Sequence, residues 1–124
     1  MGVAAIMGIV VEYDGNELWS PSLRVGNLFV DQIRSLESIV GEKSGIEFSM
    51  ADTLEVDGPV FNEFIKRALD MLDTTNNGPL FVMSSGCLQV AIALDARITG
   101  QWPAVSAKLE RLVTNARTVM DSIG

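Results

Sequence analysis

The stretch FVMSSGCLQVAIAL, residues 81–94, decides the fold because it contains no charged side chain and is apolar at most positions. A surface helix needs a polar side, and this stretch has none. We therefore predict a helix from Pro79 to about Ile98 that is buried on nearly every side, with the other elements of the chain packed around it.

The centre of this stretch consists of Ser84, Ser85, Gly86 and Cys87. Small side chains allow two helices to approach closely, and a serine hydroxyl can donate to a carbonyl one turn back. The same groups can also form the floor of a pocket, where the flexible Met83 would adapt to a ligand. We interpret Gly86 and Cys87 as packing residues, and we keep Met83, Ser84 and Ser85 as candidates for the edge of a pocket.

Two amphipathic helices are predicted before the central one. Ser20 can cap the first, with Pro21 at the first helical position, and Gly41 ends it. Asp57 can cap the second, and Pro59 is an early helical residue. The apolar residues that we expect to face the core are Leu28, Phe29, Ile33, Leu36, Ile39 and Val40 in the first helix and Val60, Phe61, Phe64, Ile65, Ala68, Leu69 and Leu72 in the second.

A fourth helix is predicted after the stop signal Thr99–Gly100, with Pro103 opening it. The segment IEFSMADTLEV, residues 46–56, follows no helical pattern, and we interpret it as a connecting loop with extended pieces. The expected inner face of the fourth helix consists of Val105, Leu109, Leu112, Val113, Ala116 and Met120.

The N-terminal part is rich in Ile and Val, and residues 4–12 and 17–19 can form a short β-hairpin around the turn signal Asp14–Gly15. A loosely held arm, ordered only in a dimer, is the alternative. The chain is thus predicted to be mainly α, a four-helix bundle with a short N-terminal β element. We expect one domain over 1–124, with a β-like arm at 1–19 and the bundle at 20–124.

Hydrophobic residues make up 48% of the 124 residues and aromatic ones only 6%, so the core is aliphatic. This much apolar surface exceeds what a small monomer hides, and we expect a homodimer. The net charge of −7 is uneven, because residues 1–73 hold 13 acidic and 5 basic residues and residues 74–124 hold 3 and 4. This acidic surface argues against binding of nucleic acid. It would attract a cationic partner, or serve only to keep an apolar domain in solution.

The chain carries no sign of export or membrane insertion. The single cysteine, Cys87, excludes an internal disulfide, and the apolar start has no basic residue before Arg24, as a signal peptide would. Residues 74–94 are uncharged, but the polar runs TTNNGP and SSG interrupt them. We expect a cytoplasmic protein with no membrane contact.

Several kinds of catalytic chemistry are excluded by composition. With no histidine and one cysteine, one chain cannot build a common zinc site, a Cys–His pair or a Ser–His–Asp triad. The segment GEKSG lacks the loop and strand of a phosphate-binding P-loop. We expect no metal and no cofactor, so acid–base chemistry would fall to a carboxylate, a lysine, Tyr13 or the ligand.

The pair Glu63 and Arg67 is the main candidate for polar chemistry on the second predicted helix. The two residues are four positions apart, in the orientation that favours a surface ion pair. Arg67 also neighbours the apolar positions Phe64 and Ala68, and at the edge of the core its guanidinium can hold a carboxylate or a carbonyl. Both interpretations remain open at this stage.

Two stretches of the chain resemble a known family: ELWSPSLRVGNLFVDQIRSLESIVGEKSGIEF and, after it, LEVDGPVFNEFIKRAL. Over about residues 17–70 the chain resembles a family of small actinobacterial proteins of unknown function. The family pattern is specific for fold and almost silent on chemistry, since most of the shared positions are helix caps and core. The matching residues are Leu18, Trp19, Pro21, Ser22, Leu28, Phe29, Gln32, Ser44, Gly45, Ile46, Asp57, Phe61 and Phe64.

In size and helical plan the chain is also similar to the lysinoalanine-forming proteins of cinnamycin-type lanthipeptide pathways. That resemblance implies a homodimer that adds a lysine amine to a dehydroalanine within a modified peptide, a reaction that needs no metal and no cofactor. Either Glu63 or a group of the peptide itself would be the base, and Arg67 would stabilise the developing enolate or orient a peptide carboxylate. The residues that would shape the peptide cavity are Phe29, Gln32, Met83, Ser84 and Ser85.

Two rival hypotheses accompany this enzyme. One is a non-catalytic module, of an adaptor or immunity type, whose acidic face binds a basic peptide or protein. The other is a purely structural homodimer. An inward pair of Glu63 and Arg67 beside an opening favours the enzyme, whereas a solvated pair together with a packed SSGC stretch favours the binding module. Tight packing of the serines and Gly86 against another helix, with no cavity, would favour the structural homodimer.

Overall fold

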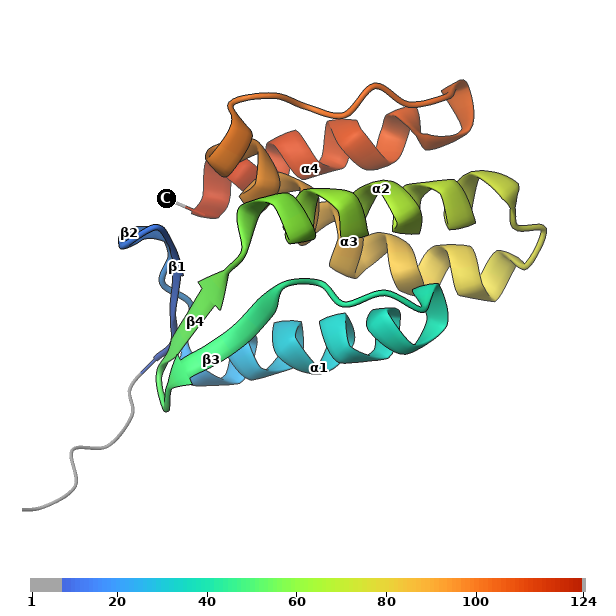
Figure 1. Cartoon of the computed structure of the whole chain (residues 1–124). Coiled ribbons are helices and arrows are strands. Elements are labelled where there is room, and N and C mark those ends of the chain that lie inside the picture. Colours follow the sequence, from blue (N-terminus) through green and yellow to red (C-terminus); the bar gives the residue numbers. More distant parts are fainter. Residues whose placement is uncertain (1–7, 124) are drawn as a thin grey trace, which may run out of the picture.

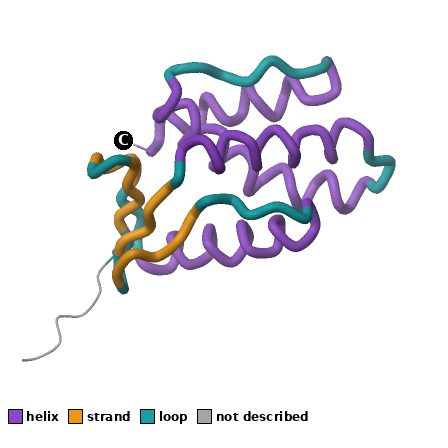
Figure 2. The backbone as a smooth tube through the Cα atoms, viewed as in Figure 1, coloured by secondary structure: helices purple, strands orange, loops and turns teal. Residues whose placement is uncertain are grey.

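A computed structural model describes residues 8–123 as a mainly helical structure with a small β-sheet, which confirms the expected class (Figures 1 and 2). The strands are β1 (Val10–Tyr13), β2 (Asn16–Trp19), β3 (Ile46–Met50) and β4 (Thr53–Val56). The helices are α1 (Leu23–Val40), α2 (Gly58–Thr74), α3 (Gly78–Thr99) and α4 (Glu110–Ile123), with a short 3-10 helix at Ala107–Leu109.

The strands form one mixed sheet in the order β2-β1-β4-β3. The predicted hairpin is confirmed for β1 and β2, whose turn holds Asp14 and Gly15 at φ of 51° and 78°. Residues 4–7 of that prediction lie outside the described residues. The β1–β2 hairpin is not a loose arm in this structure, because β1 pairs with β4, and Arg97 of α3 donates to the carbonyl of Leu18 at 2.9 Å.

Residues 46–56 were interpreted as a connecting loop with extended pieces, and only the extended pieces are confirmed, as β3 and β4. This segment is the hairpin β3–β4, and β4 pairs in parallel with β1 far away in the sequence. The apolar residues Ile46, Leu54 and Val56 are buried, while Glu47 and Glu55 are exposed. The alternation is typical of a strand with one buried face, but the pairing that stabilises it is not local.

Two predicted helix starts are displaced in the structure. Helix α1 begins after Ser22, whose Oγ accepts from the Val25 N–H at 3.3 Å, and not after Ser20. The reason is that the carbonyl of Pro21 accepts from the Ile9 N–H at 3.0 Å, which holds Pro21 in extended pairing. The cap of α2 at Asp57 is confirmed. Helix α3 begins at Gly78, with Asn77 as its cap, one residue before the predicted start at Pro79.

The fourth helix was predicted to begin at Pro103 and instead begins at Glu110, after the 3-10 turn. Residues 101–106 are neither helix nor strand, and in Figure 1 this orange segment runs back along the molecule, so that α3 and α4 point the same way. Proline disfavours helical geometry in the residue before it, here Trp102. Ser106 Oγ then donates to Asp73 Oδ1 at 2.6 Å and fixes the segment on α2.

The core is centred on α3, which contacts each of the other three helices. Its C-terminal half is buried as expected, from Cys87 through Ala96 with only Gln89 and Val90 half-buried. Its N-terminal half was predicted to be buried and is not, because Val82 and Met83 are 71% and 72% exposed. By length and composition α3 also passes as a membrane span, but half of the tested window is buried in the domain, as is typical of a core helix.

The other predicted core faces are confirmed at most positions. The exceptions are Leu28, Ile39 and Val60, whose side chains are exposed, and Val40, which is half-buried against the core. In the fourth helical region Val105 is half-buried and precedes the helix, and the side chain of Met120 lies outside the described residues. The confirmed buried residues are Phe29, Ile33, Leu36, Phe61, Phe64, Ile65, Ala68, Leu69, Leu72, Leu109, Leu112, Val113 and Ala116.

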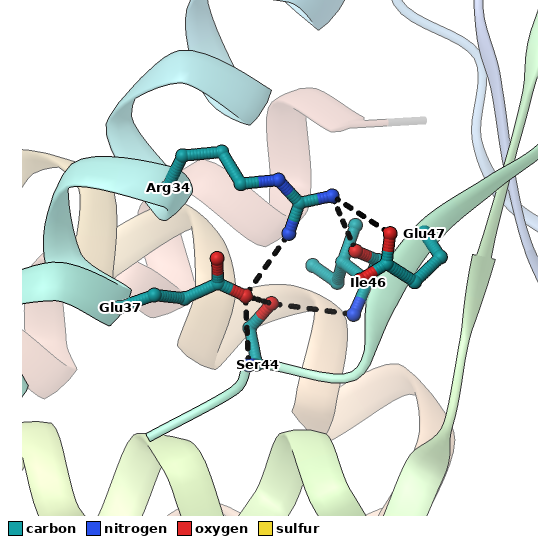
Figure 3. A network of polar contacts seen from close by, with 5 residues as sticks. All are labelled: Arg34, Glu37, Ser44, Ile46 and Glu47. Atoms are coloured by element: carbon teal, nitrogen blue, oxygen red, sulfur yellow. Dashed lines mark hydrogen bonds and ion pairs between the residues drawn. The ribbon is translucent and has the colours of Figure 1, made fainter. Parts of the chain in front are cut away.

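A polar network joins α1 to β3 (Figure 3). Glu37 Oε2 accepts from the hydroxyl and N–H of Ser44, at 2.6 and 2.9 Å, and from Arg34 at 2.9 Å. Arg34 also donates to the carbonyl of Ile46 at 2.7 Å. Burial raises the pKa of Glu37, but the hydrogen bonds from Ser44 and the nearby Arg34 outweigh it and lower that pKa overall.

This network gives the stretch Ser44, Gly45 and Ile46 a structural role. Ser44 is fully buried on Glu37 and Ile46 is fully buried in the core. Gly45 has φ of 79°, and a Cβ there would lie 3.0 Å from the side chain of Val60. Each of the three positions is therefore required by the backbone path between α1 and β3.

Candidate functional site

A groove of about 490 Å³ lies between α1 and the N-terminal half of α3. It brings together three of the predicted substrate-binding residues, Gln32, Met83 and Ser84. Ser84 is 5% exposed at the floor, whereas Met83 is 72% exposed at the rim. The complete lining is Asp31, Gln32, Ser35, Leu36, Ile39, Leu80, Met83, Ser84 and Cys87.

The other two predicted substrate-binding residues lie elsewhere. Phe29 is buried with its ring edge-on to Trp19, at 5.6 Å between ring centroids, and belongs to the core. Ser85 donates to the carbonyl of Phe81 and lines a separate cavity between α3 and the start of α4. The two adjacent serines therefore face different neighbours of α3, Ser84 toward α1 and Ser85 toward α4.

Gly86 and Cys87 were both interpreted as packing residues, and the structure agrees for Cys87 but not for Gly86. Cys87 is 2% exposed, and its burial raises the pKa of its thiol to about 12, so the thiol stays protonated at neutral pH. Gly86 was expected to allow close helix packing, and this was wrong, because a Cβ at Gly86 would meet nothing within 4 Å. Its side of α3 is open.

Glu63 and Arg67 form a surface ion pair on α2. Arg67 Nε lies 3.4 Å from Glu63 Oε1, and the side chains are 56% and 58% exposed. Neither residue lines the groove between α1 and α3. The pair is thus solvated, which meets one of the two criteria for the binding module. The other, a packed Ser84–Cys87 stretch, is not met, because Ser84 and Cys87 line the groove and Gly86 is unpacked. The ion pair contributes only about 0.3–0.5 kcal/mol to stability.

Four glutamates form a row across the sheet, a surface that was not predicted from the sequence. Glu12 is paired in register with Glu17 of β2 and with Glu55 of β4, and Glu55 is paired with Glu47 of β3. Paired residues on neighbouring strands point to the same face, so the row crosses all four strands in the order Glu17, Glu12, Glu55, Glu47. We call this set the glutamate row.

The glutamate row lies on the outer face of the sheet. Glu12 is half-buried and the other three are exposed, while Val11, Leu54 and Ile46 beside them are fully buried. Arg34 is the only described cation within ion-pair distance of the row, 3.4 Å from Glu47. The signal was present in the sequence, since each strand (VVEY, NELW, IEFSM, TLEV) carries a glutamate between less polar residues, but only the register aligns them.

The described residues contain no group of three acidic or cysteine side chains placed to hold a metal ion. Fold and surface thus define a small, mainly helical domain with a mixed four-stranded sheet and an acidic sheet face. The chain belongs to a family of unknown function, DUF6086, which matches residues 7–124. No curated protein and no solved structure matches it.

Proposed function

We propose that this protein is a non-catalytic binding module whose acidic sheet face holds an extended, Lys/Arg-rich segment of a partner protein. The glutamate row is the observation that carries the proposal. Like charges directly opposite one another cost about 0.2–1 kcal/mol per pair, and the row contains three such pairs. A cationic partner would turn that cost into binding energy.

The charge distribution supports the same partner chemistry. Of the 16 acidic residues, 13 lie within residues 1–73, which contain the whole sheet. Such a one-sided field speeds the encounter with a cationic partner and disfavours acidic ones. The proposed setting is the cytoplasm, where the one free cysteine would stay reduced.

A short oligolysine peptide is the direct probe of this proposal, with an oligoglutamate peptide as its counterpart. Calorimetry is expected to show binding of oligolysine only, with an affinity that falls steeply as salt is added. Amide NMR shifts should be largest on β1, β2, β3 and β4. Equal binding of both peptides, or shifts that avoid the strands, would refute the proposal.

The second candidate function is lysinoalanine formation in a lanthipeptide precursor. It is supported by the groove between α1 and α3, in which Gln32, Met83 and Ser84 lie together as that reaction would require. Asp31 also lines the groove, so a carboxylate is present there to accept a proton from the lysine amine. Glu63 and Arg67, on the exposed face of α2, would then have no part in the chemistry.

The test is incubation of the dehydrated, thioether-cyclised peptide with the protein, followed by fragmentation mass spectrometry. If the groove is catalytic, a lysine–alanine crosslink forms without a change in mass, and Asp31→Asn lowers its rate by about 100-fold, the size of a lost general base. The pair Glu63→Gln and Arg67→Gln is expected to leave that rate unchanged. A crosslink yield equal to the spontaneous background rejects this candidate.

We also propose that the four helices form the bundle of a homodimer, joined through the apolar strip beside the groove. Val25, Leu28 and Ile39 of α1 and Val82 and Met83 of α3 are exposed, at 48% to 72%. No charged residue occurs in α3 before Asp95, and Asp31 is the one charged residue in the lining of the adjacent groove, so a second copy meets little charge repulsion there despite the net charge of −7. Burial of such a strip is the normal outlet for excess apolar surface.

Met83→Asp is expected to convert the dimer to a monomer, because it would bury two unpaired carboxylates in the contact. Sedimentation equilibrium at micromolar protein measures this. Met50→Asp is the matched control, since Met50 is 64% exposed on β3 and lies outside the strip. A monomeric wild type, or a dimer that Met83→Asp leaves intact, contradicts the proposed contact.

A further inference from the structure

The carboxylate of Asp95 is buried and only half satisfied. Asp95 is 5% exposed near the end of α3, and its Oδ2 accepts from Asn62 Nδ2 at 2.9 Å. Its Oδ1 is buried and accepts no hydrogen bond from the described residues. Almost all buried polar atoms in folded proteins have a partner, so this oxygen calls for an explanation.

Asp95 also lines a cavity of about 420 Å³ where the start of α2, the end of α3 and the segment 101–104 meet. In Figure 1 these two helix ends lie at the end of the molecule nearest the strands. Besides Asp95, the wall of this cavity includes Asn62, Lys66 and Trp102. An incompletely paired acid in the wall of a cavity is the arrangement expected of a ligand site.

Among the described residues, no cation is hydrogen-bonded to this carboxylate. Lys66 acts on Asp95 only through its charge, and its own side chain is exposed. Arg117 lies over the ring of Trp102, at 5.3 Å from the ring centroid. Desolvation raises the pKa of Asp95, more than the hydrogen bond from Asn62 and the charge of Lys66 lower it, so the ionised form is short of stabilising donors.

We propose that this cavity binds a primary ammonium group, which donates to Asp95 Oδ1 while the aliphatic part of the ligand packs against Trp102. A charged N–H donor gives a carboxylate its shortest and strongest hydrogen bonds and offsets its buried charge. The segment 101–104, which is neither helix nor strand, forms one side of the cavity. The ammonium group belongs either to a free amine or to a lysine side chain of a peptide.

The first probes are n-butylammonium and tetramethylammonium, which share a charge but differ in N–H donors. NMR titration is expected to show saturable binding of n-butylammonium alone, followed at the Asn62 side-chain amide and the Trp102 indole. A third probe, Nα-acetyl-lysine amide, separates the sources, because tighter binding than n-butylammonium assigns the site to a peptide side chain and weaker binding to a free amine. Binding of neither ammonium, or equal binding of tetramethylammonium, overturns the proposal.

Two variants make the assignment specific. Asp95→Asn keeps a hydrogen bond to Asn62 and is expected to lower affinity by at least about 10-fold, the usual scale for a lost charged partner. Lys66→Met, at an exposed position, is expected to raise affinity by about 3-fold by removing a like charge. Asp70→Asn, another exposed position on α2, is the control. Unchanged affinity in Asp95→Asn, or weaker binding in Lys66→Met, contradicts the site.

Discussion

Replacing all four residues of the glutamate row with glutamine is expected to weaken the binding of a lysine-rich segment by about 10- to 100-fold, because four charge contacts of about 0.5 kcal/mol each are lost. The same variant is expected to unfold less readily. Removal of three like-charge pairs should raise the free energy of unfolding by about 1–2 kcal/mol. Opposite signs for binding and stability are the signature of a surface kept for function at a cost to the fold.

Calorimetry with oligolysine and urea unfolding measure the two effects on the same protein. The matched control removes four acidic charges elsewhere, as Glu42→Gln, Glu63→Gln, Glu110→Gln and Asp121→Asn, all exposed positions outside the strands. It changes the net charge equally but leaves the row intact. If the control loses as much affinity as the row variant, binding depends on net charge alone and the sheet face is not the site.

Replacing Glu37 with glutamine is expected to lower the free energy of unfolding by about 2–3 kcal/mol at neutral pH, because three donors lose their charged acceptor. The buried hydroxyl of Ser44 and the guanidinium of Arg34 would then have to share a neutral amide oxygen. The Glu37 side chain is only 18% exposed, so water replaces little of the loss. Urea unfolding measures the change, with Glu42→Gln on the exposed side as the control.

The pH dependence of the Glu37 effect follows from its lowered pKa. The unfolded value is near 4.5 and the folded value lies below it, so the carboxylate stabilises the fold fully above 4.5. That contribution disappears as the pH falls through the folded pKa. The difference between wild type and Glu37→Gln should therefore shrink in acid, and a difference that stays constant down to about pH 3 would contradict the network.

Local signals were enough to predict the helices and most of the core. The caps at Asp57 and Gly100 and the stripe on α2 depend on neighbours a few residues away, and the structure agrees with them. The β3–β4 hairpin could not be recognised in the same way, because β4 is held by β1, some 40 residues earlier in the chain. The start of α4 was missed since contacts of Ser106 and Lys108 with the end of α2 hold the preceding segment extended.

The candidate sites show the same division between local and non-local information. The spacing of Glu63 and Arg67 correctly indicated an ion pair, but only the fold shows that it lies on an open surface. Gln32 and Ser84 are 52 positions apart and meet because α1 packs on α3. The glutamate row needs the register of three strand pairs, and the cavity at Asp95 needs two helices and a return segment. The distance along the sequence between these residues does not predict that they lie together.

The position of β3 at the edge of the sheet has a consequence for the protein at high concentration. Phe48 and Met50 on this strand are 43% and 64% exposed, which makes it a template on which further strands could add to form fibrils. Arg34 already occupies the carbonyl of Ile46, and Glu47 places a charge on the strand. The charge of Glu47 is therefore expected to hinder the addition of further strands at this edge, and the glutamine variant, although harder to unfold, should precipitate sooner on storage.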